Sequence, residues 1–242
     1  MAMQVHKTVS REEWLAARKA HLAREKELTR LHDEVAAERR ALPWVKVEKD
    51  YRFDTPSGQV SLADLFEGRN QLVVYHFMLT QGSDHICEGC AFVSDHVDAA
   101  RTHFEHNDLS FVAVSRVPLS RIEAVRKRMG WKFRWASSAG SSFNFDYGVS
   151  FTKEQVASGN VGYNFGTTSL AHDDLHGLSV FYRNGDEVFH TYSTYARGVD
   201  VLLGAHNYLD LTPKGRNEKG TMDWVRLHDE YEDRPAADAC CA

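Results

Sequence analysis

The sequence predicts an α/β domain built on a strand–helix–strand unit and closed by a β-hairpin. Residues 72–78 form an apolar run typical of a strand that is buried on both faces, and residues 109–114 read as a second buried strand. Between them, residues 91–104 carry apolar side chains at the spacing of one helix face. Two alternating segments flank the turn Asn-Gly-Asp at 184–186, which is a strong hairpin signal.

The composition is that of a globular protein without a nucleic-acid or membrane surface. The chain has 242 residues, 43% hydrophobic and 26% charged, and a formal net charge of -5, so no basic surface for nucleic acid is expected. No apolar run is long enough to span a bilayer, and residues 1–7 lack the apolar core of a secretion signal. We therefore expect a cytoplasmic protein, in a compartment that keeps most thiols reduced.

The N-terminal part, residues 1–44, is predicted to form a helical arm. Ser10 and Glu13 have the spacing of a capping box, and no Gly or Pro interrupts the chain until Pro43, so residues 10–41 read as one helix. Its apolar residues are sparse among many charges, which predicts a helix lying across another surface. That surface belongs either to the same subunit or to a second one, and the second alternative predicts a homodimer through this helix.

The core domain is predicted to occupy residues 45–233. An entry hairpin at 51–58 and a short helical turn at 61–66 precede the first buried strand. That strand, the helix at 91–104 and the strand at 109–114 follow each other as a βαβ unit.

The second half of the core continues with a helix at 120–129, for which Ser120 and Glu123 offer a capping box and Gly130 a stop. Residues 143–176 match no regular pattern and are interpreted as an irregular insertion before the C-terminal hairpin. A closing helix is expected at 198–209, and residues 234–242 are expected to form a disordered tail.

A Cys-x-x-Cys motif, Cys87-Glu88-Gly89-Cys90, lies between the first buried strand and the following helix. This spacing lets two sulfurs bridge with little backbone movement, and the start of a helix favours the thiolate of the first cysteine. In a reducing compartment the motif is typical of a catalytic dithiol or half of a zinc site. We predict Cys87 as the nucleophile, with a modestly lowered pKa because Glu88 opposes its charge, and Cys90 as the resolving thiol.

The order βαβ, helix, hairpin, helix, with a redox pair after the first central strand, is that of the thioredoxin-like fold. The chain also resembles the bacterial thioredoxin-like family named domain of unknown function 899, from about residue 10 to residue 233. The blocks that carry the resemblance are LPWV at 42–45, DLFEGR at 64–69, VYHFM at 74–78, VSRVPL at 114–119, RMGW at 128–131, FNFD at 143–146, VFYR at 180–183, HTYSTYARG at 190–198 and DLTPKGR at 210–216.

Members of that family are described as predicted dithiol–disulfide oxidoreductases, so the resemblance implies a thiol–disulfide oxidoreductase with a disulfide-containing substrate, protein or small molecule. One position departs from thioredoxin-like proteins in general, most of which have a cis-proline before the strand that faces the redox pair. Here His176 and Gly177 occupy that place. The substrate groove is therefore either built differently, or the reaction is not exchange with protein disulfides.

Two other chemistries were weighed for the same motif. Asp84, His85 and the two cysteines could supply zinc ligands, with His76 or His96 near in sequence, which would make the protein a non-catalytic metal- or small-ligand-binding module. Peroxidase chemistry is disfavoured, because peroxiredoxins place a Pro and a Thr at fixed positions before the reactive cysteine. Thr80 lies too far from Cys87, and no Pro accompanies it.

Four further residues complete the prediction. Arg116 follows the carboxyl end of a strand, where α/β sheets bind ligands, and Trp131 begins an aromatic stretch, so both are candidate substrate-binding residues. Cys240 and Cys241 end the tail and are interpreted as dispensable, although a tail that passes electrons to the motif is an alternative. No bound cofactor or metal is expected, and neither is a nucleic-acid or membrane partner.

Overall fold

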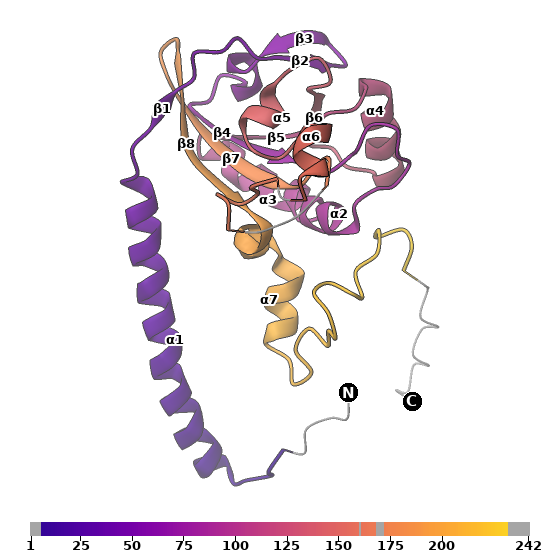
Figure 1. Ribbon diagram of the computed structural model, residues 1–242. Coiled ribbons are helices and arrows are strands. Elements are labelled where there is room, and N and C mark those ends of the chain that lie inside the picture. Colours follow the sequence, from indigo (N-terminus) through magenta and orange to yellow (C-terminus); the bar gives the residue numbers. More distant parts are fainter. Residues whose placement is uncertain (1–5, 160, 168–171, 232–242) are drawn as a thin grey trace. The chain divides into compact units, whose positions relative to one another are not determined.

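A computed structural model describes residues 6–159, 161–167 and 172–231. The chain separates into two compact units, Met1–Trp44 and Val45–Ala242 (Figure 1). The predicted tail, with Cys240 and Cys241, lies outside the described residues. None of the helices in the described ranges combines the length and the apolar character needed to cross a bilayer.

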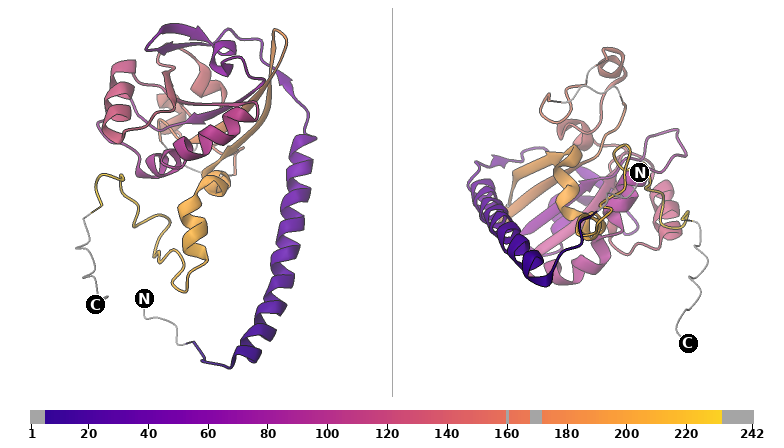
Figure 2. Two further views of the ribbon diagram at one scale, coloured as in Figure 1. Left: turned by 180° about the vertical axis from the view of Figure 1, so that it is seen from behind. Right: turned by 90° about the horizontal axis from the view of Figure 1, so that it is seen from below.

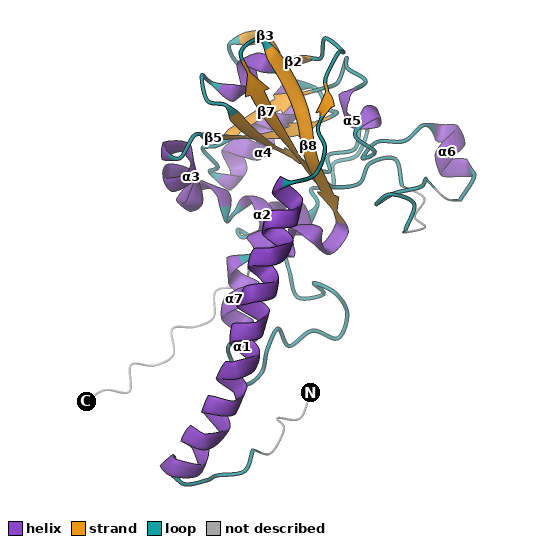
Figure 3. Cartoon of the chain, turned by 90° about the vertical axis from the view of Figure 1, so that its left-hand side faces the viewer, coloured by secondary structure: helices purple, strands orange, loops and turns teal. Residues whose placement is uncertain are grey.

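The first unit contains a single 30-residue helix, α1 (Arg11–Arg40), drawn as one uninterrupted purple coil in Figure 3. The predicted capping box is present: Ser10 Oγ accepts from the Glu13 backbone N–H, and the Glu13 carboxylate accepts from the Ser10 N–H. No residue of α1 is buried within its own unit, and its large apolar side chains are exposed. The homodimer through this helix stays a prediction.

The second unit is built on one eight-stranded sheet within the described residues, with the order β1-β8-β7-β4-β5-β6-β2-β3. Strands β4, β5 and β6 are parallel neighbours, and the antiparallel hairpin β7–β8 lies on the other side of β4. The strands are β1 (Val45–Lys46), β2 (Arg52–Thr55), β3 (Gly58–Ser61), β4 (Gln71–His76), β5 (Leu109–Ser115), β6 (Arg134–Ser137), β7 (Gly177–Asn184) and β8 (Glu187–Tyr195).

The unbroken apolar runs of β4 and β5 follow from burial of both sheet faces. Along β4, Tyr75 belongs to the core cluster that includes the helices after the motif, whereas Leu72 and Val74 belong to the opposite cluster. That opposite face is covered by the 3₁₀ turn η1 (Ala63–Phe66) and by α5 (Phe143–Asp146) (Figure 1). Successive strand residues point to opposite faces, so residues of both sets are mostly apolar.

The helix predicted at 91–104 is present as two pieces, α2 (Glu88–Ser94) and α3 (Val97–His106). The break lies at Asp95 and His96, whose side chains are used elsewhere. His96 Nδ1 pairs with the Phe92 carbonyl at 2.7 Å, and its Nε2 accepts from the Ala205 N–H at 3.0 Å. The helix is therefore broken by a tertiary contact, in which His96 binds the backbone of a distant segment. The helical spacing of apolar residues does not predict such a contact.

The helix α4 (Leu119–Met129) confirms the prediction at 120–129, and Gly130 ends it with a left-handed φ of 67°. The predicted cap is wrong, because Pro118 is the N-cap residue and Glu123 pairs with Arg126 instead. The sequence analysis also missed β6, which has only four residues and no alternation. β6 pairs in parallel with β5 and extends the parallel part of the sheet by a third strand.

The predicted insertion at 143–176 is largely irregular, with two short helices, α5 and α6 (Lys153–Ala157). Its apolar side chains form a small core of their own that includes Val149 and Tyr163, and Tyr195 of β8 joins it. The hairpin follows as predicted, and Gly185 supplies the positive φ of 60° that its turn requires.

The closing helix is also divided, into the 3₁₀ helix η2 (Ala196–Leu202) and α7 (Gly204–Asp210). Leu203 between them is fully buried and has a non-helical backbone, with φ -91° and ψ 81°. After α7 the chain turns back toward α2, as the yellow segment in Figures 1 and 2 shows. We call residues 213–231 the C-terminal segment.

Candidate redox site

Cys87 is the N-cap residue of α2, and Cys90 lies one turn later on the same helix. The Cys87 sulfur accepts from the Cys90 backbone N–H at 3.3 Å. Both cysteines are free thiols, and they differ in exposure: Cys87 is partly exposed, whereas Cys90 is 1% exposed. The start of the helix therefore leaves Cys87 partly accessible and buries Cys90.

The two thiols have opposite pKa shifts. The pKa of Cys87 is lowered, first because the Cys90 thiol donates a hydrogen bond to its sulfur; burial and the charge of Glu88 oppose this shift. The pKa of Cys90 is raised well above its ordinary value, first by burial and then by its bond to Cys87. The direction of the Cys87 shift and the opposing effect of Glu88 both agree with the sequence prediction. The thiolate therefore forms on Cys87.

A pocket of about 300 Å³ lies beside the two cysteines. The helix that carries the motif forms one wall, and segments more than 80 residues later in the chain form the others. The side chains on those later walls that matter for chemistry are His176, Arg197, Asp200, His206, Arg216 and Met222.

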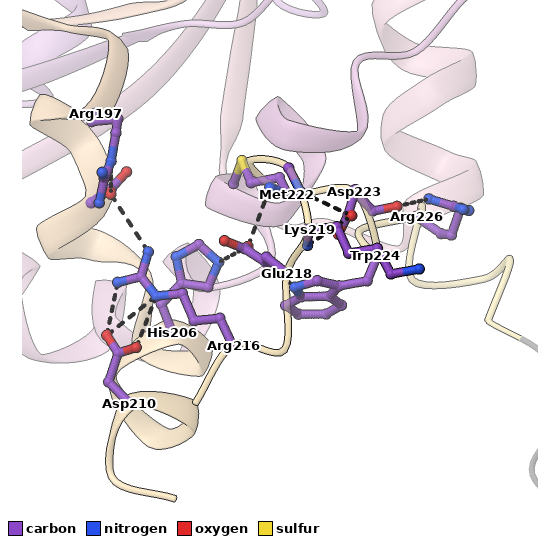
Figure 4. Close-up of polar contacts among 12 residues, drawn as sticks. Arg197, His206, Asp210, Arg216, Glu218, Lys219, Met222, Asp223, Trp224 and Arg226 are labelled. Carbon is purple, nitrogen blue, oxygen red and sulfur yellow. Dashed lines mark hydrogen bonds and ion pairs between the residues drawn. The ribbon is translucent and has the colours of Figure 1, made fainter. Parts of the chain in front are cut away.

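Charged groups at the pocket are tied together by ion pairs (Figure 4). Arg216 donates from Nε and Nη2 to the Asp210 carboxylate, and its Nη1 lies 3.8 Å from Asp200. Arg197 donates from Nε to the same Asp200 carboxylate at 2.9 Å. Two guanidinium groups are thereby held at the pocket by two carboxylates.

His206 lies next to this network and is 1% exposed. Its Nε2 is 3.7 Å from the Glu218 carboxylate, and neither ring nitrogen makes a hydrogen bond within the described residues. Burial lowers the pKa of His206, and the positive charge of Arg216 adds to this effect. The imidazole is therefore neutral near pH 7, with one donor and one acceptor left unused.

The C-terminal segment covers the motif. A Cβ built on Gly89 would lie 3.7 Å from the Met222 sulfur and 4.0 Å from the Cys87 sulfur. Glu218 anchors the segment by accepting from the Met222 backbone N–H and from the Trp224 indole, both at 3.2 Å (Figure 4). The thioether of Met222 thus lies close to Cys87.

The position that departs from thioredoxin-like proteins is built from trans peptides, since no cis bond occurs in the described part of the chain. The Tyr163 hydroxyl donates to the His176 carbonyl at 2.6 Å and accepts from the Ala196 N–H at 2.8 Å. One hydroxyl from the insertion therefore joins the start of β7 to the end of β8. At Gly177, an added Cβ would lie 2.8 Å from Tyr195.

The two predicted substrate-binding residues do not line this pocket. Arg116 pairs with the buried Asp174 carboxylate at 3.2 Å, which ties the insertion to the end of β5. Trp131 is 5% exposed and donates its indole N–H to Asp95 at 2.7 Å. Packing and ion pairing account for both residues, and their role in substrate binding stays a prediction.

The residues weighed as zinc ligands point to separate partners. His85 lies 3.7 Å from Glu88, His96 binds backbone groups, and His76 pairs with Ser179 at 2.9 Å. Within the described ranges, no three His, Cys, Asp or Glu side chains come close enough together to hold a metal ion. The metal-binding alternative therefore finds no ligand cluster in that part of the chain.

The parallel strands β4, β5 and β6, the antiparallel hairpin beside β4 and the Cys-x-x-Cys after β4 define a thioredoxin-like protein. The chain belongs to the family described as bacterial protein of unknown function (DUF899), whose model matches residues 3–231. No curated protein matches the chain.

Solved structures similar to the chain are peroxidoxin BcpB from Mycobacterium tuberculosis, the bacterioferritin comigratory protein of Xanthomonas campestris, and a candidate protein disulfide isomerase from Bacteroides thetaiotaomicron. The first is 14% identical over 67% of this chain and 94% of that chain, with a TM-score of 0.45. The second is 16% identical over 64% and 88%, with a TM-score of 0.41. The third is 15% identical over 73% and 94%, with a TM-score of 0.40.

Sequence reasoning found the two cysteines and missed the rest of the pocket. Arg197, His206, Arg216 and Met222 belong to no catalytic motif, so the motif analysis did not point to them. Two of the blocks that carry the family resemblance, at 190–198 and 210–216, contain Arg197 and Arg216. Membership of these specific blocks was the available signal.

Proposed function

We propose that this protein is a cytoplasmic thiol–disulfide oxidoreductase in which Cys87 attacks and Cys90 resolves. The observation that carries the proposal is the asymmetry of the pair. Cys87 is partly exposed with a lowered pKa, and Cys90 is buried with a raised one. A thiolate is the form that attacks a disulfide, and the attacking sulfur must be reachable.

The reaction proceeds in two exchanges. The Cys87 thiolate attacks one sulfur of a substrate disulfide, which forms a mixed disulfide and expels the other sulfur as a thiolate. Cys90 then loses its proton and attacks Cys87, which breaks the mixed disulfide and releases the second substrate thiolate. Two electrons pass from the dithiol to the substrate, and the two protons of the dithiol end on the two released thiols.

Burial of Cys90 suits the resolving role. A neutral, hidden thiol does not compete for the substrate, and it lies within hydrogen-bonding reach of Cys87 when the mixed disulfide forms. The opposing charge of Glu88 keeps the Cys87 thiolate from being strongly stabilised. Because a strong oxidant needs a strongly stabilised thiolate, the pair is expected to be reducing rather than oxidising.

The test is the redox equilibrium of the motif in defined dithiothreitol buffers, read by alkylation and intact mass. The full chain with Cys240→Ser and Cys241→Ser is used, so that Cys87 and Cys90 are the only thiols that can be oxidised. The matched control adds Cys90→Ser to these two substitutions. A reversible loss of two mass units at one potential, absent from the control, supports the proposal. If no intramolecular disulfide forms at any potential, the proposal fails and a non-catalytic binding module becomes the better account.

A further inference from the structure

The pocket beside the motif contains polar groups that the protein does not satisfy. Neither nitrogen of His206 is hydrogen bonded, although the residue is 1% exposed, and Nδ1 of His176 is also buried without a partner in the described residues. Both side chains line the pocket. Buried polar groups in native proteins are nearly always hydrogen bonded, so these three ring nitrogens offer hydrogen-bonding capacity to a ligand in the pocket.

The same pocket has guanidinium groups with donors to spare. A guanidinium carries five N–H donors. Arg216 directs Nε and Nη2 to Asp210, and its Nη1 keeps only the 3.8 Å approach to Asp200. Arg197 uses Nε on Asp200. Carboxylates are the ligands that such forks bind best, so these donors suit an anionic group on the ligand.

The walls leave little room for a polypeptide. An extended peptide bound next to β7 would pair with free backbone groups at the start of that strand. There the His176 carbonyl is already occupied by the Tyr163 hydroxyl at 2.6 Å. On another side Met222 lies beside Gly89 and Cys87. A pocket of about 300 Å³ between these walls has the size for a small molecule.

We propose that this pocket binds small disulfides that carry carboxylates, and that Cys87 and Cys90 reduce them to two thiols. The inference rests on the proposed function and names its substrate class. Arg216 and Arg197 bind the carboxylate, and His206 and His176 hydrogen bond polar groups nearer the sulfurs. For each disulfide consumed, one S–S bond breaks in the substrate and one forms between the two cysteines. The dithiol supplies the two electrons and two protons.

The experiment is a single-turnover charge series on the full chain with Cys240→Ser and Cys241→Ser, so that the only disulfide within the protein that can form is Cys87–Cys90. Pre-reduced protein is mixed with 3,3′-dithiodipropionate, bis(2-hydroxyethyl) disulfide or cystamine, which are anionic, neutral and cationic. The rate of Cys87–Cys90 disulfide formation is followed by quenching and intact mass. Each rate constant is divided by that of free dithiothreitol with the same disulfide, which removes intrinsic differences in reactivity. The anionic disulfide is expected to react about tenfold faster than the neutral one, and the cationic one slowest.

Arg216→Gln is expected to lower the rate with the anionic disulfide about tenfold more than the rate with the neutral one. Lys214→Gln is the matched control. It removes one positive charge, as Arg216→Gln does, and Lys214 lies two residues before Arg216 with an exposed side chain that does not line the pocket. The control is expected to keep the full preference. A loss that is equal for all three disulfides would indicate damage to the fold rather than loss of a binding group, and would overturn the role of Arg216.

Two further substrates separate this inference from the proposed function. If insulin, a protein disulfide, or an alkyl hydroperoxide oxidises the motif faster than every small disulfide, the substrate class is wrong while the dithiol couple stands. Equal rates across the charge series also overturn it. If oxidised dithiothreitol itself fails to form the Cys87–Cys90 disulfide, it is the proposed function that fails.

Discussion

Gly177, at the place where most thioredoxin-like proteins have their proline, should not tolerate even one extra carbon. A Cβ there would lie 2.8 Å and 3.0 Å from the Tyr195 ring and 2.9 Å from a methyl of Val149. Carbon atoms pack best at about 3.5–4.0 Å, so three contacts are too close at once. The backbone φ of Gly177 is not in the left-handed region, and the expected penalty is therefore steric alone.

The neighbours have little freedom to move. Tyr195 is 8% exposed, and its hydroxyl donates to the Tyr147 carbonyl at 2.9 Å; Val149 is fully buried. Overpacking of such a site costs about 1–3 kcal/mol. For a chain of this length each kcal/mol moves Tm by about 2–4 °C, so Gly177→Ala should lower Tm by about 2–12 °C.

The assay is thermal and urea unfolding of the full chain, with Gly140→Ala as the matched control. Gly140 is exposed, has an ordinary φ, and its added Cβ would meet nothing within 4 Å. The control should be neutral or stabilised by up to about 1 kcal/mol, because Ala restricts the unfolded chain. If Gly177→Ala is as stable as the control, the tight contact between β7, Tyr195 and the insertion is not present in solution.

Other predictions concern the thiols, a buried histidine and the N-terminal helix. With Cys90→Ala, Cys87 should be alkylated about tenfold more slowly at pH 7 than with Cys90→Ser, because only Ser keeps a donor to the thiolate; equal rates would contradict this. Above pH ~8.5 the unfolded chain loses a proton that folded Cys90, with its raised pKa, retains. Stability should therefore fall by up to about 1.4 kcal/mol per pH unit in urea titrations, and Cys90→Ala should remove that slope. Burial lowers the pKa of His76 to about 3. As the pH is lowered from ~6.5 to 3, the unfolded chain binds a proton at His76 that the folded chain does not bind, so the free energy of unfolding should fall. His76→Gln should flatten this acid dependence, and an unchanged slope would contradict the burial argument. If α1 forms a dimer, Leu31→Glu on its exposed apolar face should yield monomers in sedimentation, whereas the control Ala23→Glu should not.

The parts of the fold that could be predicted from sequence are those whose causes are local. The capping box at Ser10 and the hairpin turn at 184–186 each lie within a few residues, and both are present. The strands β4 and β5 could be predicted because burial on both faces makes most of their residues apolar. In each case the pattern and the physical cause lie in the same stretch of chain.

The errors have tertiary causes. The helix predicted at 91–104 is divided because His96 binds the backbone at Ala205, more than 100 residues later. The closing helix is divided near the other end of the same contact, where Leu203 is buried with a non-helical backbone. His96 therefore accounts for the break in the first helix, and it also binds the backbone close to the break in the second helix. The spacing of apolar residues along a helix cannot predict a hydrogen bond between residues so far apart in the sequence.

The candidate site shows the same difference between features with local causes and features with tertiary causes. Cys87 and Cys90 are three residues apart, so their relation is local, and the motif alone predicted the sign of the Cys87 pKa shift. The other walls come from His176 before β7, from η2 and α7, and from the C-terminal segment, which meet only in the folded chain. The motif could therefore predict a reaction type but not the shape of the space in which it occurs.

The Tyr163 hydroxyl is the contact that separates this protein from an open thioredoxin-like groove. It donates to the His176 carbonyl and accepts from the Ala196 N–H, so it fills two backbone positions at once. The insertion therefore occupies the backbone just before β7, and β7 itself already pairs with β4 on one side and β8 on the other. Gly177, which stands where a proline is usual, allows Tyr195 and Val149 to pack against the start of that strand.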